Sequence, residues 1–160
     1  MTGPGYDLLV VLHALSAVVG FGAVGVTGVY AASARSAPNP SRDAKLVRYF
    51  RPGTNWAERT MVMTPVLGAI VLAVGDHPAA SQAWPWAGLG CWVVAAAAAT
   101  GWCWPAERRI QDWLNGGGGS DDAKADLAGF RRACRDVQWA ASAISVLFLI
   151  AVVVMIGQPS

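Results

Sequence analysis

The chain has 160 residues, of which 54% are hydrophobic and 14% are charged, with a formal net charge of +2. Soluble domains usually carry charge on about a quarter of their residues, so this composition argues against a soluble domain and indicates a membrane protein. A helix that crosses a hydrocarbon core of ~30 Å needs about 20 apolar residues.

Four apolar segments meet this length and predict membrane-spanning helices. They cover residues 8–34, 56–75, 86–106 and 137–158. Helices satisfy their backbone hydrogen bonds within the segment, as lipid requires. The runs are continuous, whereas the strands of a membrane β-barrel alternate in short segments. We therefore predict an all-α integral membrane four-helix bundle, in which residues 1–160 form a single transmembrane domain.

The positions of the basic residues predict the orientation of these spans. All twelve Lys and Arg residues lie in the first or third loop, or within one turn of it. The N-terminal tail, the second loop and the C-terminal tail have none. The positive-inside rule then places loops 1 and 3 in the cytoplasm and both termini outside. We expect a multi-pass protein of the bacterial plasma (inner) membrane.

His13 is the only ionisable residue within the first span. On a helical wheel it shares a face with small or weakly polar residues: Ser16, Ala17, Gly20, Val24, Thr27 and Ala31. One interpretation is a packing residue that forms a hydrogen bond across a helix interface. The other is a haem or metal ligand, or a proton relay. A b-type haem in such a bundle usually has two axial ligands at similar depth, and the second histidine, His77, is expected to be shallower, so we favour packing.

Residues 42–51 predict a short amphipathic cytoplasmic helix between the first and second spans, with Ser41 as its N-cap. Its apolar residues share one arc: Leu46, Val47, Tyr49 and Phe50. Its basic residues face away from that arc: Lys45, Arg48 and Arg51. We expect this helix to lie on the inner leaflet with its basic side toward anionic head groups. A basic loop that only sets topology is the alternative.

The second span begins with Glu58 and Arg59, both within one turn of Trp56. We expect an interfacial carboxylate favoured by the helix N-terminus, with Arg59 extending toward lipid phosphate. A role in proton coupling is the alternative. Small multidrug exporters also have four helices, but they carry a membrane-embedded glutamate in the first, which is missing here. Pro65 predicts a kink within the span.

The third and fourth spans are joined by a glycine-rich segment. Residues 116–119 are four consecutive glycines and predict a flexible joint. Residues 121–136 predict a cytoplasmic extension of the fourth span, which Ser120 or Asp121 would cap. Three basic residues end this extension: Arg131, Arg132 and Arg135. We expect them to set topology, with an i,i+4 pair between Arg132 and Asp136, and to dock an acidic protein surface or an anionic phospholipid such as cardiolipin.

No pattern in the sequence indicates catalysis. We find no nucleophile with a base, no glycine-rich phosphate loop and no paired carboxylates. The three cysteines, Cys91, Cys103 and Cys134, have no metal-ligand spacing and are expected to be buried thiols. We therefore expect no enzymatic activity, no metal and no cofactor of the chain's own. A basic patch beside a membrane does not indicate nucleic-acid binding, and none is expected.

The opening "LHALSAVVGFGAVG", the four spans, the alanine-rich third span and the outward termini resemble small integral membrane proteins of actinobacteria. The chain is most similar to the family of prokaryotic respiratory supercomplex association factors, which accompany the cytochrome bcc–aa3 oxidase assembly. This resemblance implies a non-catalytic accessory subunit of the respiratory chain that contacts cytochrome bcc and aa3 components during electron transport. It transfers no catalytic residues. A haem- or quinone-linked redox protein using His13 is the first alternative, and a small transporter the second.

Overall fold

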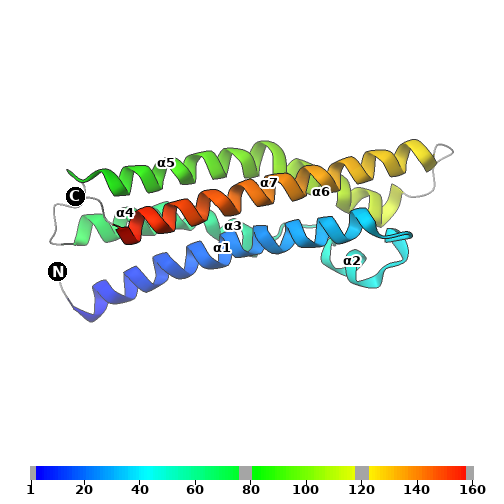
Figure 1. Ribbon diagram of the computed structural model, residues 1–160. Helices are drawn as coiled ribbons and strands as arrows, with labels where there is room; N and C mark the ends of the chain where they lie inside the picture. The colour runs from blue at the N-terminus through cyan, green and yellow to red at the C-terminus, as the bar shows by residue number, and fades with distance from the viewer. Residues whose placement is uncertain (1–2, 76–80, 118–122, 158–160) are drawn as a thin grey trace. The chain divides into compact units, whose positions relative to one another are not determined.

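The computed structural model describes residues 3–75, 81–117 and 123–157, and these residues form helices and connecting turns without a strand (Figure 1). The elements are α1 (Pro4–Ser36), η1 (Pro40–Arg42), α2 (Ala44–Tyr49), α3 (Trp56–Arg59), η2 (Thr60–Val62), α4 (Met63–Val74), α5 (Ala83–Ala98), η4 (Ala99–Cys103), α6 (Trp104–Asp112), η5 (Trp113–Gly117) and α7 (Ala123–Gly157). The all-α prediction is confirmed for the described residues. Part of the predicted glycine joint, residues 118–119, lies outside the described residues. So do Ser120 and Asp121, the expected N-caps of the fourth span's extension.

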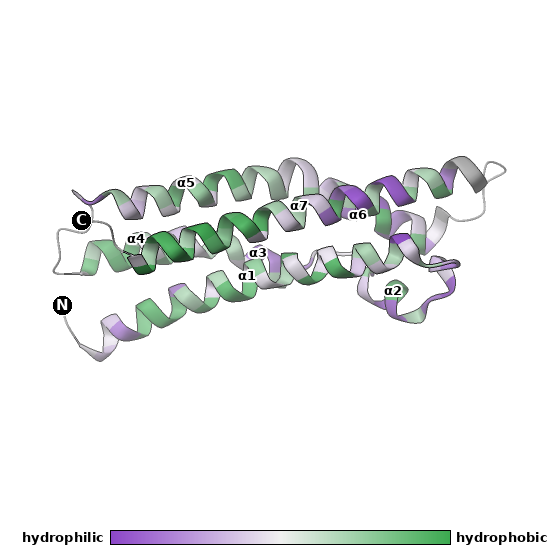
Figure 2. Cartoon of the chain, in the orientation of Figure 1, coloured by the Kyte–Doolittle hydropathy of each residue, from purple (hydrophilic) through white to green (hydrophobic). Residues whose placement is uncertain are grey.

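Four helical stretches are long and apolar enough to cross a membrane. They are Pro4–Ser36, Trp56–Val74, Ala83–Gly116 and Asp126–Gly157. Each contains most of one predicted span. Figure 2 shows hydrophobic residues along much of α4, α5 and the C-terminal part of α7, and hydrophilic residues on α2, α6 and the earlier part of α7. The chain is thus a candidate multi-pass membrane protein, and its orientation stays a prediction.

The chain divides into two compact units, which are described separately. Unit 1 comprises Met1–Val24, Asn55–Ala96 and Ile144–Ser160, and unit 2 comprises Gly25–Thr54 and Ala97–Ala143. The helices α1 and α7 therefore contribute residues to both units.

In unit 1, the second span is interrupted just before its proline. Pro65 has no N–H to donate to the carbonyl four residues earlier, at Met61. The indole Nε1 of Trp92, on α5, donates to this Met61 carbonyl at 2.8 Å. The turn that precedes α4 is the short 3₁₀ helix η2 rather than α-helix. The structure thus shows a change of helix type before Pro65, with a side chain of another span donating to the Met61 carbonyl. The predicted kink at Pro65 stays a prediction.

Two glycines let neighbouring segments of unit 1 approach closely. A Cβ added at Gly20 of α1 would lie 2.6 Å from the Met61 Cα. A Cβ added at Gly68 of α4 would lie 3.0 Å from Cε1 of His13. Neither site has room for a larger residue without movement of its neighbour. Small residues are a common means of close packing between membrane helices.

In unit 2, the short helix α2 packs its apolar side against protein. Its N-cap is Asp43 rather than the predicted Ser41, and Oδ1 of Asp43 accepts from the backbone N–H groups of Lys45 and Leu46. Ser41 instead lies within the preceding 3₁₀ turn η1. The Leu46 side chain is buried. The helix is therefore shorter than the predicted 42–51, and its apolar side is not free to enter lipid.

Tyr49 joins α2 to the first helix. Its hydroxyl lies 2.6 Å from that of Thr27, and its ring stacks on Tyr30 with centroids 3.9 Å apart. Phe50, which follows, is fully buried. These contacts fix the basic segment between the first two spans to α1.

The polar side of α6 and η5 holds the end of the first loop. Asn115 Nδ2 donates to the carbonyl of Phe50 at 3.0 Å, and Gln111 Nε2 donates to the carbonyl of Gly53 at 3.4 Å. Gly53 has a φ of 138°, which favours glycine. Gln111 also lies 3.5 Å from Glu107, and both side chains are buried. The loop backbone thus obtains hydrogen bonds from residues more than fifty positions away.

Trp92→Phe tests whether the Met61 carbonyl depends on the indole N–H. We expect the substitution to lower the free energy of unfolding by about 1 kcal/mol, because a buried acceptor loses its donor. In a Pro65→Ala background the backbone regains an N–H at position 65, so the same substitution should cost clearly less. Thermal unfolding in detergent, followed by circular dichroism, measures both costs. Equal costs in the two backgrounds would contradict this account.

Candidate functional site

His13 is half-buried and forms a hydrogen bond across the interface between α1 and α4. Its Nδ1 lies 2.9 Å from the backbone carbonyl of Thr64. Since a carbonyl only accepts, Nδ1 carries the proton. The ring occupies the space that Gly68 leaves open. This is the contact that the packing interpretation predicts.

The second ring nitrogen, Nε2, has no hydrogen-bond partner among the described residues. Histidine ligands of metals commonly donate their other ring N–H to a backbone carbonyl, as His13 does here. The described residues contain no group of three or more His, Cys, Asp or Glu placed to hold a metal ion. His77 lies outside the described residues. The haem interpretation therefore stays a prediction.

Hydroxyl groups continue this polar contact toward η2. The Ser16 hydroxyl donates to the His13 carbonyl at 2.8 Å and lies 3.3 Å from the Thr64 hydroxyl. Thr60 donates to the Ala57 carbonyl at 2.7 Å. Beside these residues lies an apolar groove of about 310 Å³. The weakly polar face predicted for the first span is therefore a real interface in unit 1.

Glu58 departs most from its predicted position. We expected an interfacial carboxylate near Trp56, but Glu58 is fully buried whereas Trp56 is 78% exposed. The amide Nδ2 of Asn55 donates to the Glu58 Oε1 at 3.1 Å. Two residues apart on a helix face nearly opposite directions, so an exposed Trp56 places Glu58 inward. The pattern of Asn at the N-cap and Glu three residues later resembles a capping box and could have indicated this pairing.

The six predicted contact residues are all exposed. They are Lys45, Arg48, Arg51, Arg131, Arg132 and Arg135. The predicted pair between Arg132 and Asp136 is wrong, because Asp136 instead lies 4.0 Å from Nε of Arg135. An ion pair of this length at a surface contributes little to stability. Arg132 forms no ion pair with any described residue.

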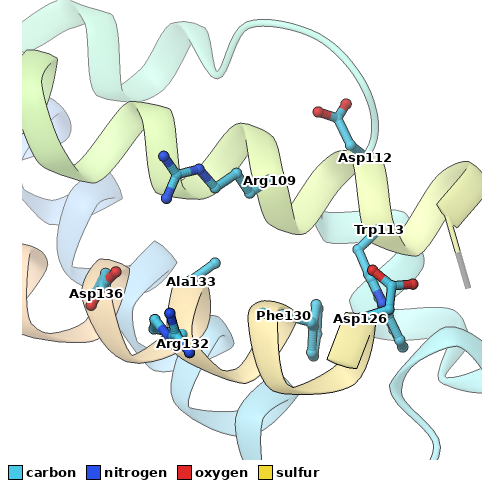
Figure 3. A pocket seen from close by; sticks show the side chains of 9 residues that line it. Arg109, Asp112, Trp113, Asp126, Phe130, Arg132, Ala133 and Asp136 are labelled. Carbon is cyan, nitrogen blue, oxygen red and sulfur yellow. The ribbon is translucent and has the colours of Figure 1, made fainter. Parts of the chain in front are cut away.

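A cleft of about 420 Å³ lies between α6–η5 and the earlier part of α7 (Figure 3). The residues that matter for its chemistry are Arg109, Asp112, Trp113, Asp126, Phe130 and Arg132. The rings of Trp113 and Phe130 lie with their centroids 4.2 Å apart. The Trp113 Nε1 is buried, and no described residue offers it an acceptor. Sequence reasoning missed this cleft, although Arg109, Asp112 and Trp113 have the spacing of one helix face.

The cysteines form no disulfide among the described residues. Cys103 and Cys134 are fully buried, and Cys91 is partly buried. Their positions agree with the expectation of small apolar side chains.

Comparison of the chain with protein-family models, with curated proteins and with solved structures finds no match. The assignment of function therefore depends on the chain's own residues and on the resemblance of its sequence.

His13→Ala separates the two interpretations of this histidine. We expect the wild-type protein, purified from native membranes, to show no Soret absorption band. We expect the variant to lose about 1 kcal/mol of stability, because the Thr64 carbonyl loses a donor and a ring-sized space opens. Absorption spectra and thermal unfolding are the measurements, with Ser16→Ala as a matched control on the same face. A Soret band that disappears only in His13→Ala would contradict the packing role.

Proposed function

We propose that the chain is a non-catalytic accessory or assembly subunit of a respiratory complex in the plasma membrane of an actinobacterium. It would link or stabilise a cytochrome bcc–aa3 supercomplex through helix packing and lipid contacts. In this proposal loops 1 and 3 are cytoplasmic and both termini are outside.

The observation that carries this proposal is a continuous apolar stripe on α7, in unit 1. Its residues recur at helical spacing and are between 46% and 78% exposed: Val146, Leu149, Ile150, Val153 and Ile156. In the most apolar 18-residue stretch of this helix, only 17% of the residues are buried within the chain. Bulky residues on one helix face form ridges that fit the grooves of another helix. The stripe is thus well suited to the apolar flank of a partner subunit.

The identity of the partner rests on the sequence resemblance rather than on geometry. The opening of the first span and the four-span arrangement are similar to respiratory supercomplex association factors. The exposed basic residues on and beside α2 and on α7 support contacts with anionic phospholipid such as cardiolipin.

Two observations bear on the alternative functions, a redox protein and a small transporter. The Nε2 of His13, which has no hydrogen-bond partner among the described residues, favours a haem- or quinone-linked redox protein as the second candidate. The buried Glu58 supplies the carboxylate that a small transporter would need, at the start of the second span rather than in the first.

A mild-detergent pull-down from native membranes, with mass spectrometry of the co-purified proteins, tests the proposal. We expect bcc and oxidase subunits in stoichiometric amounts. Leu149→Ala with Val153→Ala should release them, because the stripe loses its bulk. Val93→Ala with Val94→Ala, on exposed residues of α5, is the matched control and should retain them.

Purification of the wild-type chain without these subunits would show the proposal to be wrong. A coloured, partner-free protein would favour the redox function instead.

A further inference from the structure

Three hydrogen-bond donors at the cleft in unit 2 have no acceptor among the described residues. Arg109 comes from α6 and Arg132 from α7, on the two sides of the cleft (Figure 3). Neither guanidinium forms an ion pair with a described residue. The Trp113 Nε1, also at the cleft, is buried and has no acceptor in the part of the chain that the structure describes. A buried donor of this kind is costly unless a ligand or water satisfies it.

Two carboxylates at the same cleft have no cationic partner among the described residues. Asp112 and Asp126 form no ion pair with a described residue, whereas Asp136 lies near Arg135. Among the described residues, the groups at the cleft that form no ion pair are therefore two arginines and two aspartates, and their formal charges cancel. A ligand with a net negative charge would meet carboxylates as well as guanidinium groups. A zwitterionic ligand, with a separate anion and cation, complements both.

The position of the cleft along the chain indicates where it meets the membrane. Residues 126–136 directly precede the apolar run that begins at Val137, and residues 109–113 follow the apolar part of the third span. In the membrane placement proposed above, the cleft lies at the level of the lipid head groups. Phe130 and Ala133 give it an apolar side. Its volume of about 420 Å³ is in the range of small-ligand sites.

We propose that this cleft binds the head group of a zwitterionic phospholipid with a free ammonium, namely phosphatidylethanolamine. The phosphate lies between Arg109 and Arg132, and the Trp113 indole donates to one of its oxygens. The ammonium is attracted by the carboxylate of Asp126. The inference rests on the proposed membrane placement and does not depend on the partner complex. A pull-down without respiratory subunits would therefore contradict the proposed function but not this lipid site.

Native mass spectrometry of the full chain in detergent tests this site. Phosphatidylethanolamine and phosphatidylglycerol with the same acyl chains are added at equal concentration, and the fraction of protein carrying each lipid is measured. We expect the wild type to retain phosphatidylethanolamine in preference. Arg109→Gln and Arg132→Gln should each weaken its binding about tenfold, since each removes a charged hydrogen-bond donor.

The carboxylate and the control variants make the test specific. Asp126→Asn should weaken binding of phosphatidylethanolamine and leave phosphatidylglycerol unchanged or bound more tightly. Arg108→Gln is the matched control, because this arginine is an exposed neighbour that does not line the cleft. We expect it to leave the preference unchanged. Circular dichroism confirms that every variant keeps its helical content.

Three results would overturn the proposal. Equal retention of the two lipids would show that the head-group ammonium is not recognised. A loss in the control variant as large as in the cleft variants would show general surface electrostatics. No retained phosphatidylethanolamine in the wild type would show that the cleft does not hold this lipid.

Discussion

In an α-helix the Met61 carbonyl would accept from the backbone N–H at position 65, which Pro65 lacks, and the packing of unit 1 supplies a side-chain donor to that carbonyl. Lipid has no hydrogen-bond donor to replace the missing N–H, so the replacement donor must come from another span. Trp92 from α5 donates to the Met61 carbonyl, and His13 from α1 donates to the Thr64 carbonyl nearby. Gly20 and the small face of α1 allow the backbones to come close enough for these bonds. The small residues of α1 thus allow the close helix packing in which these hydrogen bonds to the backbone of the second span form.

Much of the helical organisation could be predicted from composition, because lipid permits few alternatives to apolar helices. The small face of α1 was also readable, since it follows directly from helical periodicity. The partners of His13 and Trp92 could not be read in the same way, because their acceptors lie 51 and 31 residues away in the chain. Glu58 was misplaced for a different reason. Its proximity to Trp56 in sequence indicated the membrane interface, but helix geometry turns the two side chains to opposite sides.

The basic residues at the start of α7 also have contacts that could not be predicted from the sequence. Its arginines were recognised as a group from their number alone. Successive residues on a helix differ in direction by about 100°, so members of such a group serve different contacts. Arg132 lines the cleft with Arg109 of another helix, whereas Arg135 lies beside Asp136. Which arginine has which neighbour depends on the packing of α6 against α7, and local sequence does not contain that information.

The hydrogen bond from Trp92 to Met61 also has a consequence for biosynthesis. Spans emerge from the ribosome in order, so α1 is already present when the second span enters the membrane, and His13 can bind Thr64 at once. Trp92 arrives only with the following span, so the Met61 carbonyl is without this donor until then. Association of membrane helices after insertion is a separate step from insertion itself. For unit 1, the hydrogen bond between Trp92 and Met61 can form only after the third span has joined the first two.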